Sequence, residues 1–365
     1  MPGFRAARDA VSRRYAKEKG THMERNRTLP LPYSVHETPD GFMVSGPHAQ
    51  TPEESNDKGT VSSVYVIRHN RAACIVDTGR HEASYNALAA ILRKHGLDVR
   101  YIILTHDHYD HVGNAERLRD AFGGEVLAHV LDRPLIEAPL SLYEADVMRR
   151  WYGVSMQEAW ADMGFSDEAV AAMRKGAARL FNTPVIVDTY ISEERHLDLA
   201  GLEVRLLHTP GHSPGSLSVH VPSKGTVYTG DLTFWVNPCR PYPIGNALNC
   251  VKSLERIRAL CPVYCGHGHY LGVPAPDAWL KNIISRHHCL RDSILNLLDT
   301  PQTIAQLRKG IFPTDPPDSF PPIPENSIQA WLAALLQEKN VIRCGTDSSG
   351  ACMFARGEHI RPISR

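Results

Sequence analysis

The sequence predicts an α/β protein in which β-sheets are covered by helices. Stretches with the apolar pattern of strands alternate with amphipathic helical stretches along most of the chain. The length of 365 residues, 42% of them hydrophobic and 22% charged, is sufficient for a substantial core. Loops rich in His and Asp also follow several of the predicted strands, which indicates that polar side chains gather at strand ends.

The first half of the chain alternates between strands and helices. VSSVYVIR (61–68) has the alternation of a strand, and AACIVDTG (72–79) follows after a short turn, so the two stretches predict a hairpin. An amphipathic helix is predicted at 83–95, then a buried strand at 101–104. A helix that begins near Asn114 and a strand at 125–130 follow.

The segment at about 139–180 interrupts this alternation with a helical insertion that is rich in Met and aromatic residues. Strands return after the insertion, and their predicted ranges are 197–199, 202–208, 216–221, 226–229 and 263–265. A helix is predicted at 247–260. The chain up to residue 272 is therefore expected to form one main domain.

The two ends of the chain differ from this main domain, which covers 29–272. Residues 1–28 carry an excess of Arg and Lys without an apolar run, and we expect a disordered basic tail. Residues 273–365 contain a long amphipathic helix at 277–298, a second helix at 327–339 and two strands within 341–356. This order predicts a small winged-helix-like C-terminal domain.

Charge and cysteine usage limit the classes of partner and location. Lys plus Arg and Asp plus Glu are both 40, so the net charge is zero and gives no support for a nucleic-acid partner. No apolar run approaches the roughly 18 residues that cross a bilayer. The eight cysteines include no C-x-x-C pair, and we expect reduced thiols in a cytoplasmic protein.

The stretch LTHDHYDHVGN (104–114) concentrates three histidines and two aspartates directly after an apolar strand. His106 and His108 are two residues apart, so both rings can point to one side of an extended segment. Asp110 and His111 follow at the turn into a helix, so one loop could offer ligands to two cations. Mixed imidazole and carboxylate ligands suit Zn²⁺, Fe²⁺ or Mn²⁺.

Three later loops supply the groups that this loop lacks. His212 lies in the Pro- and Gly-rich loop HTPGHSPG, Asp231 ends the strand VYTGD, and His267 lies between glycines in YCGHGHY. The nearby residues His208, His220 and His269 are expected at the surface or behind the ligands, and His287 and His288 are expected to be structural or exposed to solvent.

These motifs, with Val76-Asp77-Thr78-Gly79 upstream, resemble those of the metallo-β-lactamase-fold hydrolase superfamily over about residues 60–272. The resemblance implies a four-layer αβ/βα sandwich as the catalytic domain. It also implies a first metal on His106, His108 and His212, a second on Asp110, His111 and His267, a bridging Asp231, and Asp77 as support behind the ligands. The helical tail is similar to that of the glyoxalase II-like and lactamase-like branch.

The expected chemistry is hydrolysis of an ester-like bond, such as a thioester, lactone or carboxylic ester. Two Zn²⁺ ions, or Fe or Mn in their place, would share a water and lower its pKa from about 15.7 towards neutrality. The resulting bridging hydroxide would attack the substrate, and Asp110 would orient it or accept a proton as the catalytic residue. The basic and Tyr residues that bind glutathione in glyoxalase II are not matched.

The insertion is the best guide to the substrate, which we expect to be a small molecule. Its aromatic residues either pack the insertion onto the main domain or cover an apolar or aromatic acyl group. The candidate pocket residues are Tyr143, Trp151, Tyr152 and Trp235.

The alternative function is that of an endoribonuclease, because one branch with a winged-helix tail cuts RNA. The predicted recognition helix SIQAWLAALLQEK holds one basic residue, which disfavours binding to phosphates. The tail is instead expected to pack on the main domain, to frame the pocket or to form a homodimer.

Overall fold

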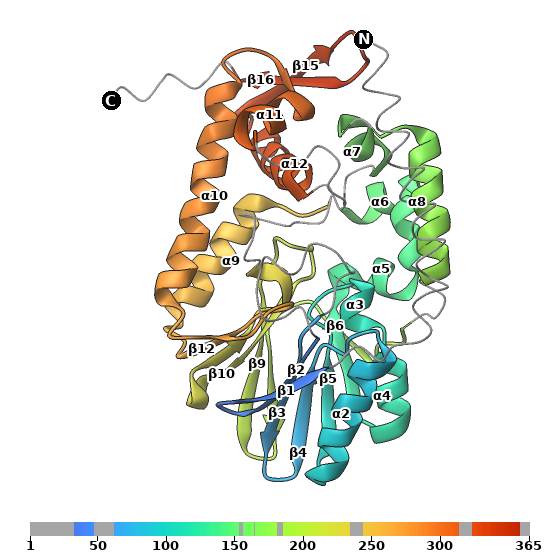
Figure 1. Cartoon of the computed structure of the whole chain (residues 1–365), viewed down its shortest axis with the longest axis vertical. Coiled ribbons are helices and arrows are strands. Elements are labelled where there is room, and N and C mark those ends of the chain that lie inside the picture. The colour runs from blue at the N-terminus through green and yellow to red at the C-terminus, as the bar shows by residue number, and fades with distance from the viewer. Residues whose placement is uncertain are drawn as a thin grey trace.

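The computed structural model describes residues 33–46, 62–152, 156–163, 165–180, 185–233, 244–313 and 323–357. Two sheets face each other, and helices cover the outer face of each sheet (Figure 1). The four-layer αβ/βα sandwich expected from the sequence is therefore confirmed. Within the described ranges, every helix is too short or too polar to cross a lipid bilayer.

The first sheet has seven strands in chain order. Its first four strands form an antiparallel meander, and the remaining strands run parallel to β4. The parallel strands end at one edge of the sheet, where loops can meet. The strands are β1 (Ser34–Thr38), β2 (Gly41–Ser45), β3 (Val64–His69), β4 (Ala72–Val76), β5 (Asp98–Ile103), β6 (Glu125–His129) and β7 (Thr189–Ile191).

The second sheet has six strands and is antiparallel except for the parallel pair β11 and β12. That parallel pair brings two more loops to the same edge. In spatial order the strands are β13 (Val273–Pro274), β12 (Tyr264–Gly266), β11 (Thr226–Tyr228), β10 (Leu217–Val221), β9 (Leu202–His208) and β8 (Arg195–Leu199).

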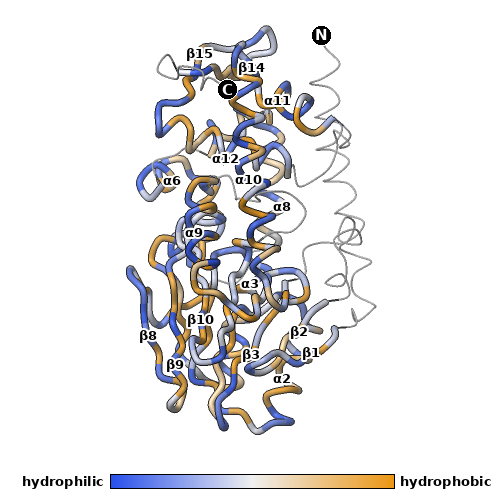
Figure 2. Tube along the Cα trace, turned by 90° about the vertical axis from the view of Figure 1, so that its left-hand side faces the viewer, coloured by the Kyte–Doolittle hydropathy of each residue, from blue (hydrophilic) through white to orange (hydrophobic). Residues whose placement is uncertain are grey.

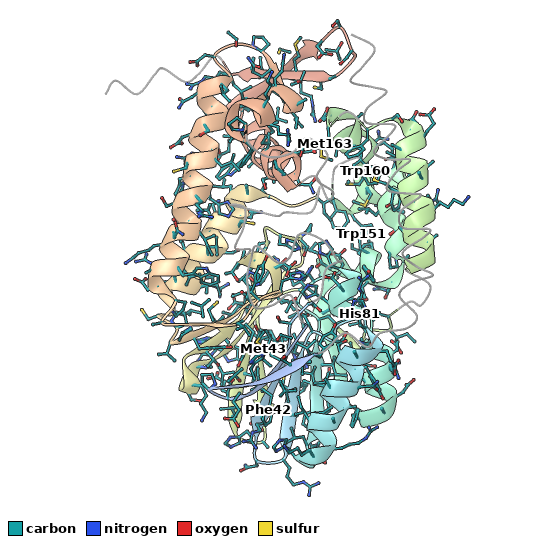
Figure 3. The ribbon with its side chains drawn as sticks, in the orientation of Figure 1. Phe42, Met43, His81, Trp151, Trp160 and Met163 are labelled. Atoms are coloured by element: carbon teal, nitrogen blue, oxygen red, sulfur yellow. The ribbon has the colours of Figure 1, made fainter. Side chains whose placement is uncertain are left out.

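Three hydrophobic clusters fill the spaces between the four layers. α2 (Glu82–Lys94) and α4 (Ala115–Phe122) pack on the first sheet, and α9 (Ala247–Ala259) and α10 (Asp277–Leu297) pack on the second. Alternation along each strand divides its side chains between clusters: in Figure 3 the neighbours Phe42 and Met43 belong to different layers of the core. Figure 2 shows that apolar and polar residues also alternate along the strands and helices.

The insertion between β6 and β7 is helical, as expected. It begins with the short helices η2 (Val130–Asp132), α5 (Arg133–Glu137) and η3 (Pro139–Tyr143). Its longer members are α6 (Ala145–Tyr152), α7 (Met156–Asp162) and α8 (Asp167–Leu180). Figure 3 shows Trp151, Trp160 and Met163 in this part, beyond the end of the sandwich.

The C-terminal part contains a helix that the sequence pattern did not reveal. α11 (Ile304–Ile311) begins with a capping box, in which Thr303 Oγ1 accepts from Gln306 N–H and Gln306 Oε1 accepts from Thr303 N–H. α12 (Ile323–Gln337) follows, and β15 (Val341–Thr346) and β16 (Cys352–Arg356) pair with the short β14 (Gln302–Thr303). Figures 1 and 2 place this small sheet at the far end of the molecule from α2. The winged-helix assignment stays a prediction.

Candidate metal centre

Four loops at neighbouring strand ends supply the candidate ligands. They follow β5, β9, β11 and β12 and cover residues 104–111, 209–216, 229–231 and 267–269, and the first of them runs into a short helix. Backbone hydrogen bonds join these loops: Leu217 N–H donates to Thr105 O at 2.8 Å across the two sheets, and Gly268 N–H donates to Gly230 O at 2.9 Å. The topology thus brings together side chains that lie more than 160 residues apart in the sequence.

The first ligand group consists of His106, His108, His212 and Asp231, whose ligand atoms all lie within 4.8 Å of one another. His212 Nε2 lies 3.2 Å from His108 Nδ1 and 3.7 Å from Asp231 Oδ2, and His106 Nε2 lies 3.9 Å from the same oxygen. All four were expected at a metal ion. Three imidazoles and a carboxylate form the donor set of a four-coordinate zinc or iron site.

The second ligand group consists of Asp110, His111 and His269, all buried. His269 Nε2 lies 3.4 Å from His111 Nε2 and 3.8 Å from Asp110 Oδ2. His111 Nε2 lies 3.9 Å from the same Asp110 oxygen. Asp110 and His111 begin the short helix α3 (Tyr109–Val112), so one turn of helix directs both side chains inward.

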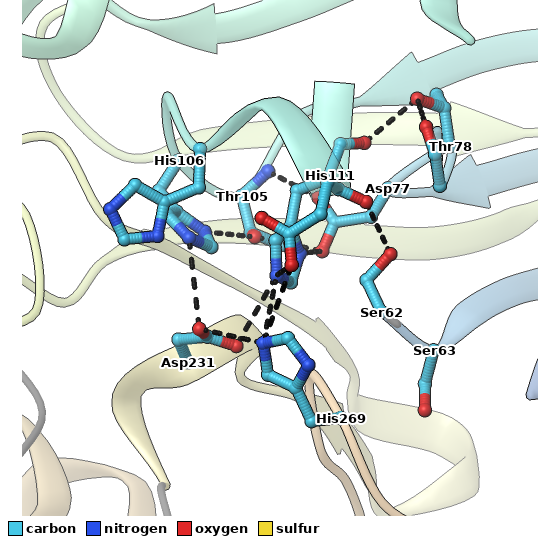
Figure 4. A network of polar contacts seen from close by, with 12 residues as sticks. Ser62, Ser63, Asp77, Thr78, Thr105, His106, His111, Asp231 and His269 are labelled. Atoms are coloured by element: carbon cyan, nitrogen blue, oxygen red, sulfur yellow. Dashed lines mark hydrogen bonds and ion pairs between the residues drawn. The ribbon is translucent and has the colours of Figure 1, made fainter. Parts of the chain in front are cut away.

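Asp231 stands between the two groups. Its Oδ2 lies 3.0 Å from His269 Nε2, and its Oδ1 lies 3.4 Å from His111 Nε2 (Figure 4). Burial would raise the pKa of Asp231, but His269 and His111 outweigh it and hold the pKa well below its usual value. Asp231 is therefore an ionised carboxylate shared by both groups, which is the geometry expected of a bridging ligand.

Gly268 allows the last loop to approach Asp231. A Cβ atom at this position would lie 2.0 Å from Asp231 Oδ1 and 2.9 Å from the backbone carbon of Gly230. Any side chain would push the loop away and carry His269 out of the second group. The glycine is thus required by a close approach.

Asp77 lies behind the ligands and forms hydrogen bonds to His111 and Thr105. Its Oδ2 accepts from His111 Nδ1–H at 2.7 Å and from the Thr105 hydroxyl at 2.9 Å, and its Oδ1 accepts from Thr105 N–H at 2.8 Å (Figure 4). Thr105 Oγ1 in turn accepts from His106 Nδ1–H at 3.0 Å. Both histidines therefore hold a proton on Nδ1 and direct Nε2 into the centre.

The protonation of the histidines suits cations. Burial and the neighbouring histidines lower the pKa of His106 well below its usual value, and burial with His212 lowers the pKa of His108 to about 3. Both rings are then neutral at neutral pH, which is the form that binds metal. Burial would also lower the pKa of His111, but Asp231 and Asp77 raise it to about 10. The metal-free ring therefore holds a second proton on Nε2, and a cation of the second group would displace it.

Unpartnered buried atoms give an independent test of fit for metal ions. Within the described ranges, His106 Nε2 and Asp110 Oδ2 are buried and have no hydrogen-bond partner. Such groups cost free energy unless something fills the space between them. Cations held by the two groups would satisfy both atoms, so the residues present fit a dinuclear centre.

The last histidine of the site differs from the expectation. His269 joins the second group, whereas His267 does not. His267 Nδ1 accepts from His269 N–H at 2.9 Å, and its buried ring packs 4.9 Å from that of Tyr270 and 6.2 Å from that of Trp279. The sequence does carry a signal for His269, because G-H-G-H repeats the alternate-residue spacing of His106 and His108 after a strand.

The aromatic residues expected to line a pocket are mainly used for packing. The Tyr143 ring lies 5.1 Å from that of Trp160, and the Tyr152 hydroxyl donates to Leu131 O at 2.7 Å. Trp151 is 41% exposed and is the candidate among these that remains accessible to a ligand. Trp235 lies outside the described residues.

Comparisons with known proteins show which family the chain resembles. The sequence profile of the metallo-beta-lactamase superfamily matches residues 57–269. An uncharacterised protein of Mycobacterium tuberculosis is 30% identical over 177 residues, which are 47% of this chain and 67% of that protein. A hydroxyacylglutathione hydrolase of Pelagibacter ubique is 23% identical over 56% of this chain and 65% of its own length. The chain thus spans about two thirds of these curated relatives.

Solved structures show the same fold over more of the chain. A metallo-beta-lactamase family protein of Thermus thermophilus superposes with a TM-score of 0.60 at 22% identity, covering 81% of this chain and 93% of that one. A beta-lactamase domain protein of Burkholderia ambifaria gives 0.63 at 17% identity, covering 91% and 97%. With its profile match over more than half of its length and its His and Asp centre at the shared strand ends, the chain belongs to the metallo-beta-lactamase superfamily.

Proposed function

We propose that the chain is a dinuclear-metal hydrolase that cleaves a thioester, lactone or carboxylic ester with an apolar or aromatic acyl group. The position of Asp231 carries the proposal, because its Oδ2 lies 3.7 Å from His212 Nε2 in one group and 3.0 Å from His269 Nε2 in the other. A carboxylate shared in this way suits two neighbouring cations. The nitrogen and oxygen donors favour Zn²⁺, with Fe or Mn as alternatives.

Bound metal ions would supply a water of lowered pKa and polarise the scissile carbonyl group. The side chains of the protein then have two tasks. Asp77 and Thr105 fix the ring orientations of His111 and His106 through hydrogen bonds. Burial would raise the pKa of Asp110, but His111 and His269 lower it below its usual value, so Asp110 is ionised and able to take the proton of the attacking water.

Two observations support an acyl substrate. The Pelagibacter ubique relative is named as a hydrolase of an acylated glutathione, which is a thioester. Trp151 offers an exposed aromatic ring on α6, next to the packed residues of the insertion. An aromatic ring of this kind would contact an apolar acyl group rather than a phosphate.

The buried state of α12 argues against the alternative of a ribonuclease that reads RNA with its tail. A recognition helix must present one face to a groove. α12 instead buries most of its length in the core: Ile328, Trp331, Leu332 and Leu335 are each at most 1% exposed, and Ser327 and Gln329 are also buried. We therefore expect a small-molecule substrate.

The test is a hydrolysis screen of protein stripped with a chelator and reloaded with Zn²⁺, Mn²⁺ or Fe²⁺. The substrates are aryl thioesters, lactones, aryl esters, phosphodiesters and RNA. We expect turnover of one of the three acyl classes with reloaded protein only. Turnover of RNA or phosphodiesters alone would replace the proposal with the nuclease alternative.

Asp110→Asn and Asp120→Asn form a matched pair for this screen. Asp110 belongs to the second ligand group, whereas Asp120 is exposed on α4. We expect Asp110→Asn to lower kcat at least about 100-fold, in the range of a lost general base, and Asp120→Asn to leave it unchanged. Equal activity of the two variants would refute the role of Asp110.

A further inference from the structure

A buried carboxylate outside the two ligand groups binds the loop that carries His212 of the first group. Asp132 lies at the end of η2, where β6 leads into the insertion, and is 1% exposed. Its Oδ2 accepts from the Ser213 hydroxyl at 2.6 Å, and its Oδ1 accepts from Gly215 N–H at 2.6 Å. Both donors lie within three residues after His212, so Asp132 binds the loop of the third histidine.

The same carboxylate also lies near the side chain of Asp107, between His106 and His108. Burial, followed by the charge of Asp132, raises the pKa of Asp107. Burial raises the pKa of Asp132 to about 7 although the hydrogen bonds from Ser213 and Gly215 lower it. A carboxylate is costly to bury, and its retention here indicates that it holds these donors in place.

We propose that Asp132 is a positioning residue for the first metal ion, because it holds the loop that carries His212, the third histidine of the first group. The proposal rests on the dinuclear centre proposed above. Asp132 contributes no ligand atom to either group within the described residues. It acts through the hydroxyl of Ser213 and the backbone N–H of Gly215.

The loop of His212 is shaped to receive Asp132. A Cβ atom at Gly215 would lie 2.5 Å from Asp132 Oδ1, so only glycine leaves room for the carboxylate. Within the loop, Ser213 N–H donates to Ser216 Oγ at 2.9 Å, which keeps the Ser213 hydroxyl directed at Asp132. Removal of Asp132 would leave the Ser213 and Gly215 donors buried without their acceptor, and the loop would have to shift.

The test measures Zn²⁺ affinity for each ligand group separately, by competition with a chromophoric chelator. His269→Ala leaves only the first group intact, and His212→Ala leaves only the second. We expect Asp132→Ala to weaken Zn²⁺ binding about 10- to 100-fold in the His269→Ala background, which is the usual effect of a lost outer partner. In the His212→Ala background we expect no change. Equal loss in both backgrounds, or loss in neither, would overturn the proposal.

Asp40→Ala is the matched control for the loss of a buried carboxylate. Asp40 is 5% exposed, and its carboxylate accepts from the Thr226 hydroxyl at 2.6 Å and from the Tyr228 hydroxyl, away from both ligand groups. We expect Asp40→Ala to lower the melting temperature without a change in Zn²⁺ affinity in either background. If Asp40→Ala weakens the first group as much as Asp132→Ala does, the effect is general destabilisation and the proposal fails.

Two milder variants keep the test decisive if Asp132→Ala does not fold. Ser213→Ala removes one donor, and Asp132→Asn keeps one acceptor oxygen, so both should weaken the first group less than Asp132→Ala while leaving the second group unchanged. Unchanged first-group affinity in both would contradict the proposal. A wild-type protein that binds no Zn²⁺ would instead refute the dinuclear centre, which separates the two failures.

Discussion

Asp77 fixes the ring orientation and the protonated nitrogen of two ligand histidines, because both hydrogen-bond paths end at its carboxylate. His111 Nδ1–H and the Thr105 hydroxyl both donate to Asp77 Oδ2. Thr105 Oγ1 in turn accepts a hydrogen bond from His106 Nδ1–H. Asp77 itself has φ of +60°, a region that aspartate and asparagine tolerate better than other side chains. Asparagine can therefore replace it without backbone strain, and a substitution tests the carboxylate alone.

We expect Asp77→Asn to weaken metal binding about 10- to 100-fold, because the amide has one oxygen and cannot accept from His111, the Thr105 hydroxyl and Thr105 N–H together. The melting temperature of the metal-free protein should stay close to the wild-type value while the metal affinity falls. Calorimetric titration of the stripped variant with Zn²⁺ measures the change. Wild-type affinity in this variant would show that Asp77 has no role in holding the ligands.

His269 and His267 give a second prediction at the scale of the residue. His269→Ala should reduce the bound Zn²⁺ from two ions per chain to one, because it removes a member of the second group. His267→Asn should retain both ions, since the asparagine Oδ1 can replace Nδ1 as acceptor for His269 N–H. Metal analysis after gel filtration measures both. Loss of an ion in His267→Asn but not in His269→Ala would restore the original sequence-based assignment.

At the scale of the element, the ends of strands were predictable and their side-chain partners were not. The ranges of β4, β9, β11 and α9 follow from apolar periodicity, and the loops after the strands carried six of the seven expected ligands into the two groups. His267 was expected in place of His269 because sequence spacing does not reveal which ring turns inward. That choice depends on Trp279 and Tyr270, which pack beside His267. Asp132 was missed because no local pattern links it to Ser213, 81 residues away.

α10 carries a buried histidine that predicts acid sensitivity. His287 is 1% exposed against Trp331, and burial followed by the charge of His288 lowers its pKa to about 3. As the pH falls below about 6.5, His287 therefore takes up a proton in the unfolded chain but stays neutral in the folded chain. The stability that neutral His287 contributes is full above about pH 6.5 and is lost as the pH falls from there towards 3.

We expect His287→Leu to reduce the loss of stability between pH 7 and pH 5 by about 2 kcal/mol, which is the cost of one proton taken up only by the unfolded chain over this interval. Urea unfolding of metal-free protein at both pH values measures the difference, so that the ligand histidines contribute equally to both proteins. His288→Gln is the control, because His288 is only partly buried. The same pH dependence in His287→Leu and wild type would contradict the prediction.

At the scale of the whole molecule, one hydrophobic cluster crosses the boundary expected near residue 272. It contains Val227 of the second sheet, Met156 of the insertion and Trp331 of α12. Arg343 of β15 also donates to Asp162 at the end of α7 at 2.8 Å. The C-terminal part is therefore packed as a continuation of the main core. We expect it to unfold together with the main domain rather than in a separate transition.

Trp331→Ala should destabilise the whole protein by about 3–5 kcal/mol, the usual cost of removing a fully buried aromatic side chain. Because the core is continuous, calorimetry should show a single transition that moves to lower temperature. Trp151→Ala, at an exposed position of α6, should change the transition little. A separate low-temperature transition in Trp331→Ala would indicate that the C-terminal part is an independent domain.

The 21 residues of α10 have a mechanical consequence. An uninterrupted α-helix of this length measures about 30 Å and resists bending. One end brings Trp279 against the ring of His267, next to the last ligand loop. At the other end, Arg356 of β16 donates to Leu295 O at 2.8 Å and to Leu298 O at 3.2 Å. A molecule that displaced the C-terminal hairpin would therefore shift α10 as a rigid body, and α10 would shift the last ligand loop with it.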